Sequence, residues 1–156
     1  MSEIQNSPYA PPRAAVEDHA GGPAPARPPV VDRAVKILWI GFGIGVLSTL
    51  YNLVFPMAVQ KASPLALTLA LAAVGYAVSI WIYLAIGSGR NWARILYFIF
   101  TVFSLIGLLY TFVVFRMFGG VRVAFALVGT LLHCYVAYLL LTEQAREWYR
   151  AVKEAR

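Results

Sequence analysis

His133 is the side chain around which any chemistry of this protein would have to be built. It is the only residue deep in an apolar stretch whose charge can change near neutral pH. A metal site needs further ligands, and the adjacent Cys134 points about 100° away from His133 on a helix. The same divergence excludes a cysteine–histidine nucleophilic pair, and no Asp or Glu occurs between Arg33 and Thr142 to orient the imidazole ring. The sequence therefore predicts no catalytic residue, no metal site and no cofactor, and the protein is predicted not to be an enzyme.

A histidine at membrane depth still requires an explanation, because buried ionisable groups are costly in a bilayer. Ser104 and Tyr76 are predicted to lie at the depth of His133 and to hydrogen-bond to its neutral imidazole. The favoured interpretation is a packing histidine that is satisfied by these neighbours. A ligand-binding or proton-binding site is the alternative.

The elements that carry these residues are four apolar runs, at 34–55, 65–86, 93–115 and 121–141. A helix needs about 20 residues to cross a hydrocarbon core of roughly 30 Å, and it satisfies its own backbone hydrogen bonds there. Short connectors separate the runs, so that neighbouring helices are antiparallel. The chain is 60% hydrophobic and 13% charged, with a mean hydropathy of +0.70. We therefore predict an all-α membrane protein, a four-transmembrane-helix antiparallel bundle over 32–141.

Two further segments flank this bundle. Residues 1–31 hold seven of the nine prolines and are predicted to be a disordered Pro/Ala-rich cytoplasmic tail. Residues 142–156 predict a short cytoplasmic amphipathic helix, with Ala145, Trp148, Tyr149 and Val152 on its apolar face. We expect this face to rest on lipid headgroups, and a partner-binding helix is the alternative.

Basic residues near the ends of the runs predict the orientation. With the N-terminus inside, ten of the thirteen Lys and Arg residues lie on the inner side, and Lys61, Arg116 and Arg122 lie outside. Both termini are therefore predicted to be cytoplasmic. The net charge of +6 then reflects topology and an affinity for anionic lipid headgroups, not nucleic-acid binding.

A stripe of small and polar residues follows one face of the first run, at Gly41, Gly45, Ser48 and Asn52. Such stripes let helix backbones approach closely in lipid, where no hydrophobic effect drives association. The stripe is predicted to pack helices within the bundle. A homo-oligomer seam is the alternative.

Two similar sequences close the second and the fourth run. Arg90-Asn-Trp-Ala-Arg94 follows the second run, and Arg146-Glu-Trp-Tyr-Arg150 follows the fourth. The echo suggests two tandem helical hairpins, each fixed at headgroup level by an indole between two phosphate-binding arginines. The candidate interface anchors are Arg90, Trp92, Arg94, Arg146, Trp148 and Arg150.

A resemblance rests on the loop Gly87-Ser-Gly-Arg-Asn-Trp-Ala-Arg94, on the Arg-x-Trp-aromatic sequence after the fourth run, and on the opening Ser7-Pro-Tyr-Ala-Pro-Pro12. In these motifs the chain resembles small uncharacterised bacterial four-helix inner-membrane proteins of the domain-of-unknown-function type. The resemblance covers most of the chain and implies a location in the bacterial cytoplasmic membrane, but little about activity. Small multidrug transporters have the same size, yet the glutamate in their first membrane helix has no counterpart here.

These observations favour an integral membrane protein that acts through protein or lipid contacts, without catalysis. A small transporter or channel that does not depend on a carboxylate is the alternative, supported by the hairpin repeat and by His133. Polar groups around a common cavity would favour transport, whereas an occluded bundle would favour partner binding.

Overall fold

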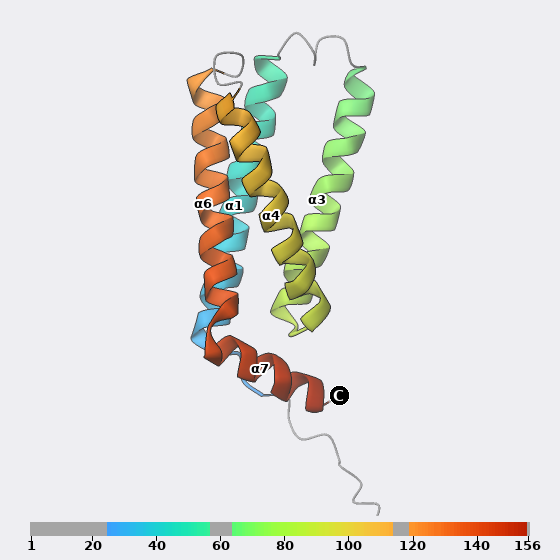
Figure 1. Ribbon diagram of the computed structural model, residues 1–156. Coiled ribbons are helices and arrows are strands. Elements are labelled where there is room, and N and C mark those ends of the chain that lie inside the picture. Colours follow the sequence, from blue (N-terminus) through green and yellow to red (C-terminus); the bar gives the residue numbers. More distant parts are fainter. Residues whose placement is uncertain (1–24, 57–63, 114–118, 156) are drawn as a thin grey trace, which may run out of the picture.

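The described part of the chain in the computed structural model, residues 25–56, 64–113 and 119–155, is helical and contains no strand. Its elements are α1 (Pro29–Val54), α3 (Leu65–Gly87), α4 (Asn91–Val113), α6 (Gly120–Leu141) and α7 (Glu143–Glu154). All but α7 are long and apolar enough to cross a membrane, and they run alternately in opposite directions (Figure 1). The predicted all-α four-helix bundle is confirmed, while most of the predicted tail, 1–24, lies outside the described residues.

Helix α1 begins five residues earlier than the predicted start of the first run, at Pro29 rather than at residue 34. Pro28 is extended, with φ −69° and ψ 150°, as expected for a residue that precedes a proline. Pro29 then occupies the first turn, where its missing N–H leaves no hydrogen bond unmade. Asp32 therefore lies inside the first turn and pairs with Lys36 at 2.8 Å.

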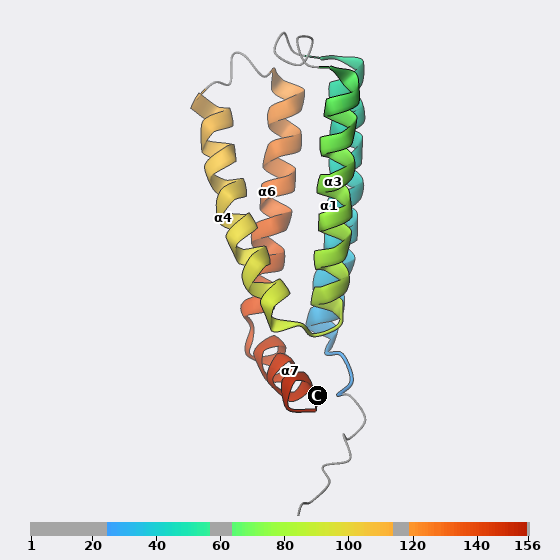
Figure 2. The ribbon, with the colours of Figure 1, turned by 90° about the vertical axis from the view of Figure 1, so that its right-hand side faces the viewer.

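The bundle is tight at one end and open at the other. Helix α6 packs along α1 and α4, and α1 also contacts α3, whereas α3 and α4 contact each other much less than α1 and α6 do. Figure 1 shows α3 diverging from α4 and α6 with increasing distance from α7, and Figure 2 shows α4 diverging from α3 and α6 in the same direction. The most extensive packing therefore joins α1 and α6, which belong to different predicted hairpins, and the arrangement is not symmetric.

The apolar core lies in the half of the bundle nearer α7. Val31, Ile86 and Leu140 have no exposed surface there, and Val136 is 1% exposed. In the opposite half, large side chains such as that of Leu109, 67% exposed, point away from the protein. In a bilayer these side chains contact lipid tails. Because the tails are as apolar as the side chains, the hydrophobic effect does not drive the helices to pack together in this half.

A tight turn ends α3 at the closed end of the bundle. Gly89 has φ +76°, the left-handed conformation that favours glycine after a helix. Its N–H donates to the Ile86 carbonyl at 3.1 Å, and the N–H of Arg90 donates to the Ala85 carbonyl at 3.0 Å. This pair of bonds is a Schellman motif, which satisfies carbonyls that the helix itself leaves unbonded.

Side chains from distant segments bond the same helix end. The Tyr149 hydroxyl of α7 donates to the Ile86 carbonyl at 3.0 Å, and Nη2 of Arg27 donates to the Gly87 carbonyl at 2.6 Å. Burial raises the pKa of Tyr149 to about 12, because the phenolate would lose its hydration, so the hydroxyl remains a donor at neutral pH. Helix α7 and the segment before α1 therefore complete the end of α3.

The apolar face predicted for α7 is its buried face. Ala145, Trp148, Tyr149 and Val152 are its buried residues, and they cover the end of the bundle (Figure 2). The indole N–H of Trp148 donates to the Pro25 carbonyl at 3.1 Å. We expected this face to rest on lipid headgroups, and the structure corrects that expectation, because hydrophobic periodicity marks an apolar face without showing what covers it.

Candidate functional site

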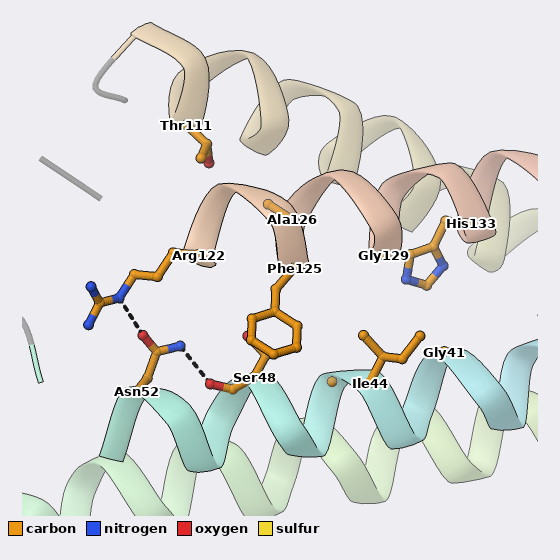
Figure 3. Close-up of a pocket in the computed structure, with 11 residues that line it drawn as sticks. Gly41, Ile44, Ser48, Asn52, Thr111, Arg122, Phe125, Ala126, Gly129 and His133 are labelled. Atoms are coloured by element: carbon orange, nitrogen blue, oxygen red, sulfur yellow. Dashed lines mark hydrogen bonds between the residues drawn. The ribbon is translucent and has the colours of Figure 1, made fainter. Parts of the chain in front are cut away.

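A cavity of about 330 Å³ lies between α1, α4 and α6, in the open half of the bundle (Figure 3). Ligand pockets usually have volumes of about 300–1,000 Å³, so this cavity is large enough for a small molecule or a segment of a lipid chain. It extends along α6 from Arg122 to His133, roughly 16 Å at 1.5 Å per residue. The lining residues are Gly41, Ile44, Gly45, Ser48, Asn52, Thr111, Arg122, Phe125, Ala126, Gly129 and His133.

A hydrogen bond between Arg122 and Asn52 joins α6 to α1 at the end of the cavity that lies opposite His133. Nε of Arg122 donates to Oδ1 of Asn52 at 2.7 Å, and the Asn52 amide donates to the Ser48 carbonyl at 2.8 Å (Figure 3). Nη2 of Arg122 donates to the Phe55 carbonyl. The guanidinium carbon also lies 5.5 Å from the centre of the Tyr51 ring, within the range of a cation–π interaction. A permanent positive charge is thus fixed beside the cavity.

The predicted packing stripe of α1 is one wall of this cavity, because all four of its residues line it. A Cβ on Gly41 would lie 3.9 Å from the Leu132 side chain of α6. A Cβ on Gly45 would lie 4.0 Å from the Tyr76 ring of α3. The stripe therefore faces neighbouring helices within the bundle.

His133 lies at the deep end of the cavity and bonds to Tyr97. Its Nδ1 is 2.8 Å from the Tyr97 hydroxyl, which also contacts the His133 carbonyl at 3.4 Å. Tyr97 belongs to α4 and is 2% exposed. The pair joins α4 to α6 in mid-bundle, and the sequence between Asp32 and Glu143 contains no Asp or Glu.

The two partners predicted for His133 bond elsewhere. The hydroxyl oxygen of Ser104 lies 3.1 Å from the hydroxyl oxygen of Thr130. The Tyr76 hydroxyl lies 2.6 Å from the Thr49 hydroxyl oxygen and donates to the Gly45 carbonyl at 3.0 Å. The prediction was wrong because counting along a helix gives depth, whereas the rotation of the helix about its axis decides which neighbour a side chain meets.

A second space, a groove of about 520 Å³, lies between α3 and α4 where these helices separate. His133 lines this groove as well as the cavity, and Tyr97 lines the groove but not the cavity. Apolar side chains such as Val78, Phe100 and Phe103 form most of the walls. The other lining residues are Gly75, Ser79, Ile82, Tyr83 and Ser104.

The predicted interface anchors do not have equivalent surroundings. Trp92 is 37% exposed and its ring lies 4.6 Å from that of Trp81, whereas Trp148 is 9% exposed and packed under the bundle. The Arg94 guanidinium lies 5.0 Å from the centre of the Tyr149 ring, and its Nε and Nη1 are buried without a hydrogen-bond partner among the described residues. Like Trp92, the anchors Arg90, Arg146 and Arg150 are exposed. The expected equivalence of Trp92 and Trp148 is therefore corrected.

Sequence reasoning did not identify Tyr97, or Arg122 as a cavity residue. The sequence did contain a signal for Arg122. Arg122 lies near the start of the fourth run and Asn52 near the end of the first run, and the antiparallel arrangement predicts these two positions at the same depth. No comparable signal distinguished Tyr97 from the other tyrosines of the apolar runs.

The described residues contain no group of three or more His, Cys, Asp or Glu side chains placed to hold a metal ion. Comparison with known proteins adds no assignment, since no protein-family model, curated protein or solved structure matches the chain. Among the described residues, hydrogen-bonding side chains line both spaces, and the Arg122 side chain lines the cavity.

Proposed function

We propose that this multi-pass membrane protein is not an enzyme and acts by binding a lipid-like molecule within its helical bundle. The observation that carries the proposal is the groove between α3 and α4, with a volume of about 520 Å³. Its walls are largely apolar, and Ser79 and Ser104 supply a few hydroxyl groups. Binding pockets typically combine such apolar walls with few polar groups.

The size of the groove favours a lipid chain over the helix of a partner protein. One turn of a helix, about 10 Å wide and 5.4 Å tall, fills roughly 400 Å³. The groove therefore holds little more than a single turn, too little for the several turns over which helices pack in membranes. An acyl chain is narrow enough to enter such a space from the bilayer.

The groove is tested by a substitution that fills it. Gly75 lines the groove, and no atom lies within 4 Å of the position of an added Cβ, so Gly75→Leu should occupy the space without moving the backbone. Gly107→Leu is the matched control, because its Cβ position is equally open and Gly107 does not line the groove. Lipid that copurifies in mild detergent should fall for Gly75→Leu alone, as measured by mass spectrometry.

Equal amounts of lipid on both variants would contradict the proposal. A stoichiometric copurifying protein, lost from Gly75→Leu while lipid is retained, would contradict it as well and would favour a protein partner.

We further propose that the protein resides in a bacterial cytoplasmic membrane with the α7 end facing the cytoplasm. The loop and tail motifs support the membrane, and the excess of basic residues at the α7 end supports the orientation. On this side the exposed Arg90, Arg146 and Arg150 would meet anionic lipid headgroups.

The orientation predicts the behaviour of reporter fusions. Alkaline phosphatase fused after Arg156 should be inactive, because that enzyme folds only after export from the cytoplasm. A fusion within the connector 57–63 should be active. High phosphatase activity from an Arg156 fusion of normal abundance would reverse the orientation.

A small transporter or channel is the second candidate, favoured by the two spaces that both reach His133. A route across the protein would also have to pass the core at the α7 end, where Ile86 and Leu140 are fully buried. Transport therefore requires the α7 end to open, whereas binding requires no such change. Flux into liposomes carrying the purified protein would favour this candidate.

A further inference from the structure

Two residues that line the groove between α3 and α4 carry a polar atom without a hydrogen-bond partner among the described residues. Tyr83 of α3 is only 8% exposed, and its hydroxyl bonds to none of the described groups. His133 of α6 bonds to Tyr97 through Nδ1, and its Nε2 makes no hydrogen bond within the described part of the chain. Buried polar groups are nearly always hydrogen-bonded, because a group that loses water without a replacement partner costs free energy. The two atoms are therefore available to bond to a molecule that enters the groove.

The bond with Tyr97 determines which nitrogen of His133 carries the proton. A phenol is the stronger donor and an imidazole nitrogen the stronger acceptor, so we assign the proton of this 2.8 Å bond to the Tyr97 oxygen. The sequence has no Asp or Glu between Asp32 and Glu143 to stabilise a charged imidazolium at this depth, so the ring is neutral. The proton of the neutral ring then lies on Nε2. Both unpartnered groups, the Tyr83 hydroxyl and Nε2 of His133, are thus hydrogen-bond donors.

Aromatic rings form much of the wall around these donors. Besides Tyr83, the groove is lined by Tyr97 and Phe100, which lie on one face of α4 at a spacing of three residues, and by the neighbouring Phe103. Phe100 is 46% exposed and Phe103 is 64% exposed, so both also contact the surrounding lipid in a bilayer. Aromatic side chains pack favourably against other flat rings, in offset stacks or edge to face. Such a wall suits a flat ring better than an acyl chain.

The composition and the depth of the groove exclude a charged ligand group. Among the described residues that line it, none is a Lys, Arg, Asp or Glu. His133 lies about 12 Å from the end of α6 at Leu141 and about 20 Å from its other end at Gly120, at 1.5 Å per residue. The headgroups of phospholipids lie outside a hydrocarbon core that is about 30 Å thick. A ligand group that reaches the two donors is therefore an uncharged one that tolerates the interior of the bilayer.

We propose that the groove binds a lipid-soluble quinone, with its flat ring among the aromatic side chains and its carbonyl oxygens bonded to the Tyr83 hydroxyl and to Nε2 of His133. A quinone ring is uncharged, carries two acceptor oxygens and is attached to an apolar chain. These three properties match the lining, the two donors and the largely apolar walls. The assignment of this lipid class rests on the lipid-binding function proposed above.

Three probes separate the contributions of the ring and of the carbonyl oxygens. One is a benzoquinone that carries three methyl groups and a decyl chain, which leaves no ring position open to the Cys134 thiol. The second is the corresponding benzene without oxygen atoms, and the third is methyl laurate, which has an ester carbonyl but no ring. Binding to the purified full-length protein in an uncharged maltoside detergent is measured by native mass spectrometry. The quinone should bind about tenfold more tightly than the benzene, because two hydrogen bonds between neutral groups together contribute about one factor of ten.

Variants test the two donors separately. Tyr83→Phe keeps the ring and breaks no hydrogen bond between described residues, so it should fold, and it should weaken quinone binding about threefold without changing the affinity for the benzene. His133→Asn keeps a side-chain oxygen that accepts from Tyr97 and removes Nε2, with the same expected result. Tyr138→Phe is the matched control and should bind like the wild type, because Tyr138 is 64% exposed and does not line the groove. Unchanged quinone affinity in both Tyr83→Phe and His133→Asn would overturn the proposal.

Gly75→Leu, which fills the groove, distinguishes failure of the quinone assignment from failure of the lipid-binding function. If the three probes bind the wild type equally and Gly75→Leu weakens all of them, the groove binds lipid but the quinone assignment is wrong. If Gly75→Leu leaves the binding of all three unchanged, the groove is not the binding site and both proposals fail. Tighter binding of methyl laurate than of the quinone would also overturn the assignment and would identify an ester lipid instead.

Discussion

Trp148→Ala is expected to lower the free energy of unfolding by about 3 kcal/mol, whereas Trp92→Ala should lower it by about 1 kcal/mol. The indole of Trp148 is 9% exposed, packs edge-on against the Tyr149 ring at 5.0 Å and donates to the Pro25 carbonyl. Its removal leaves a cavity beneath the bundle and an unsatisfied carbonyl. Trp92 is 37% exposed and loses mainly its contact with Trp81.

The measurement is unfolding of the purified variants by a denaturing detergent in mixed micelles, followed by circular dichroism. Trp81→Ala is a useful control, because it removes the same aromatic pair from the other side and should match Trp92→Ala. Equal losses for Trp92→Ala and Trp148→Ala would support the equivalence suggested by the two Arg-x-Trp-x-Arg sequences, and would contradict the arrangement described above.

The spans were predictable from the sequence because bilayer thickness and helix geometry fix the length of an apolar run. Helix α3 was predicted at 65–86 and is found at Leu65–Gly87, and α6 was predicted at 121–141 and is found at Gly120–Leu141. The start of α1 was placed too late, because the local effect of Pro28 and Pro29 outweighed the hydropathy pattern that suggested a later beginning.

The contacts between helices were not predictable in the same way. The apolar face of α7 was recognised from its period, but its cover was taken to be lipid and is the bundle itself. His133 was assigned the correct depth and the wrong partner, since its partner, Tyr97, depends on how α4 is rotated against α6. In a membrane, nearly every face of a helix is apolar, so hydrophobicity carries little information about which face turns inward.

The cavity illustrates the same limit. Gly41, Gly45, Ser48 and Asn52 were expected to pack helices within the bundle, and they face α6 and α3 as expected, but they also line a space that the sequence did not predict. Small residues permit two helices to approach closely but do not enforce it. The distance between α1 and α6 is also set by the Arg122–Asn52 hydrogen bond, at the ends of these helices that lie farthest from α7.

Gly89→Ala is expected to destabilise the protein by about 2–4 kcal/mol and to release α7 from the bundle. An alanine at φ +76° costs about 1 kcal/mol from its conformation alone. In addition, its Cβ would lie 2.9 Å from Cγ1 of Val152 and 3.2 Å from the Trp148 ring, closer than carbon atoms approach without repulsion. The residue thus fixes how closely α7 packs against the end of α3.

Gly119→Ala is a control that lacks the steric contact. Gly119 has φ +73° and ψ 153°, a region that is adopted almost only by glycine and that differs from the left-handed conformation of Gly89. Nothing lies within 4 Å of the position of an added Cβ, so Gly119→Ala should lose only a conformational contribution, about 1–3 kcal/mol, and should leave α7 packed. Detergent-induced unfolding gives the two free energies, and hydrogen exchange in α7 reports the release directly. Equal protection of α7 in the two variants would show that α7 does not press on Gly89.

The steric part can be isolated further with Val152→Ala, which removes the Cγ1 atom that an added Cβ at residue 89 would approach most closely. Val152→Ala by itself should be destabilising, since Val152 is 7% exposed and packs in the core. In the double variant, however, the cost of Gly89→Ala should fall toward its conformational part of about 1 kcal/mol, a coupling of about 1 kcal/mol or more. Additive losses would mean that the cost at residue 89 is conformational alone. Coupling would assign it to the contact by which α7 closes the bundle.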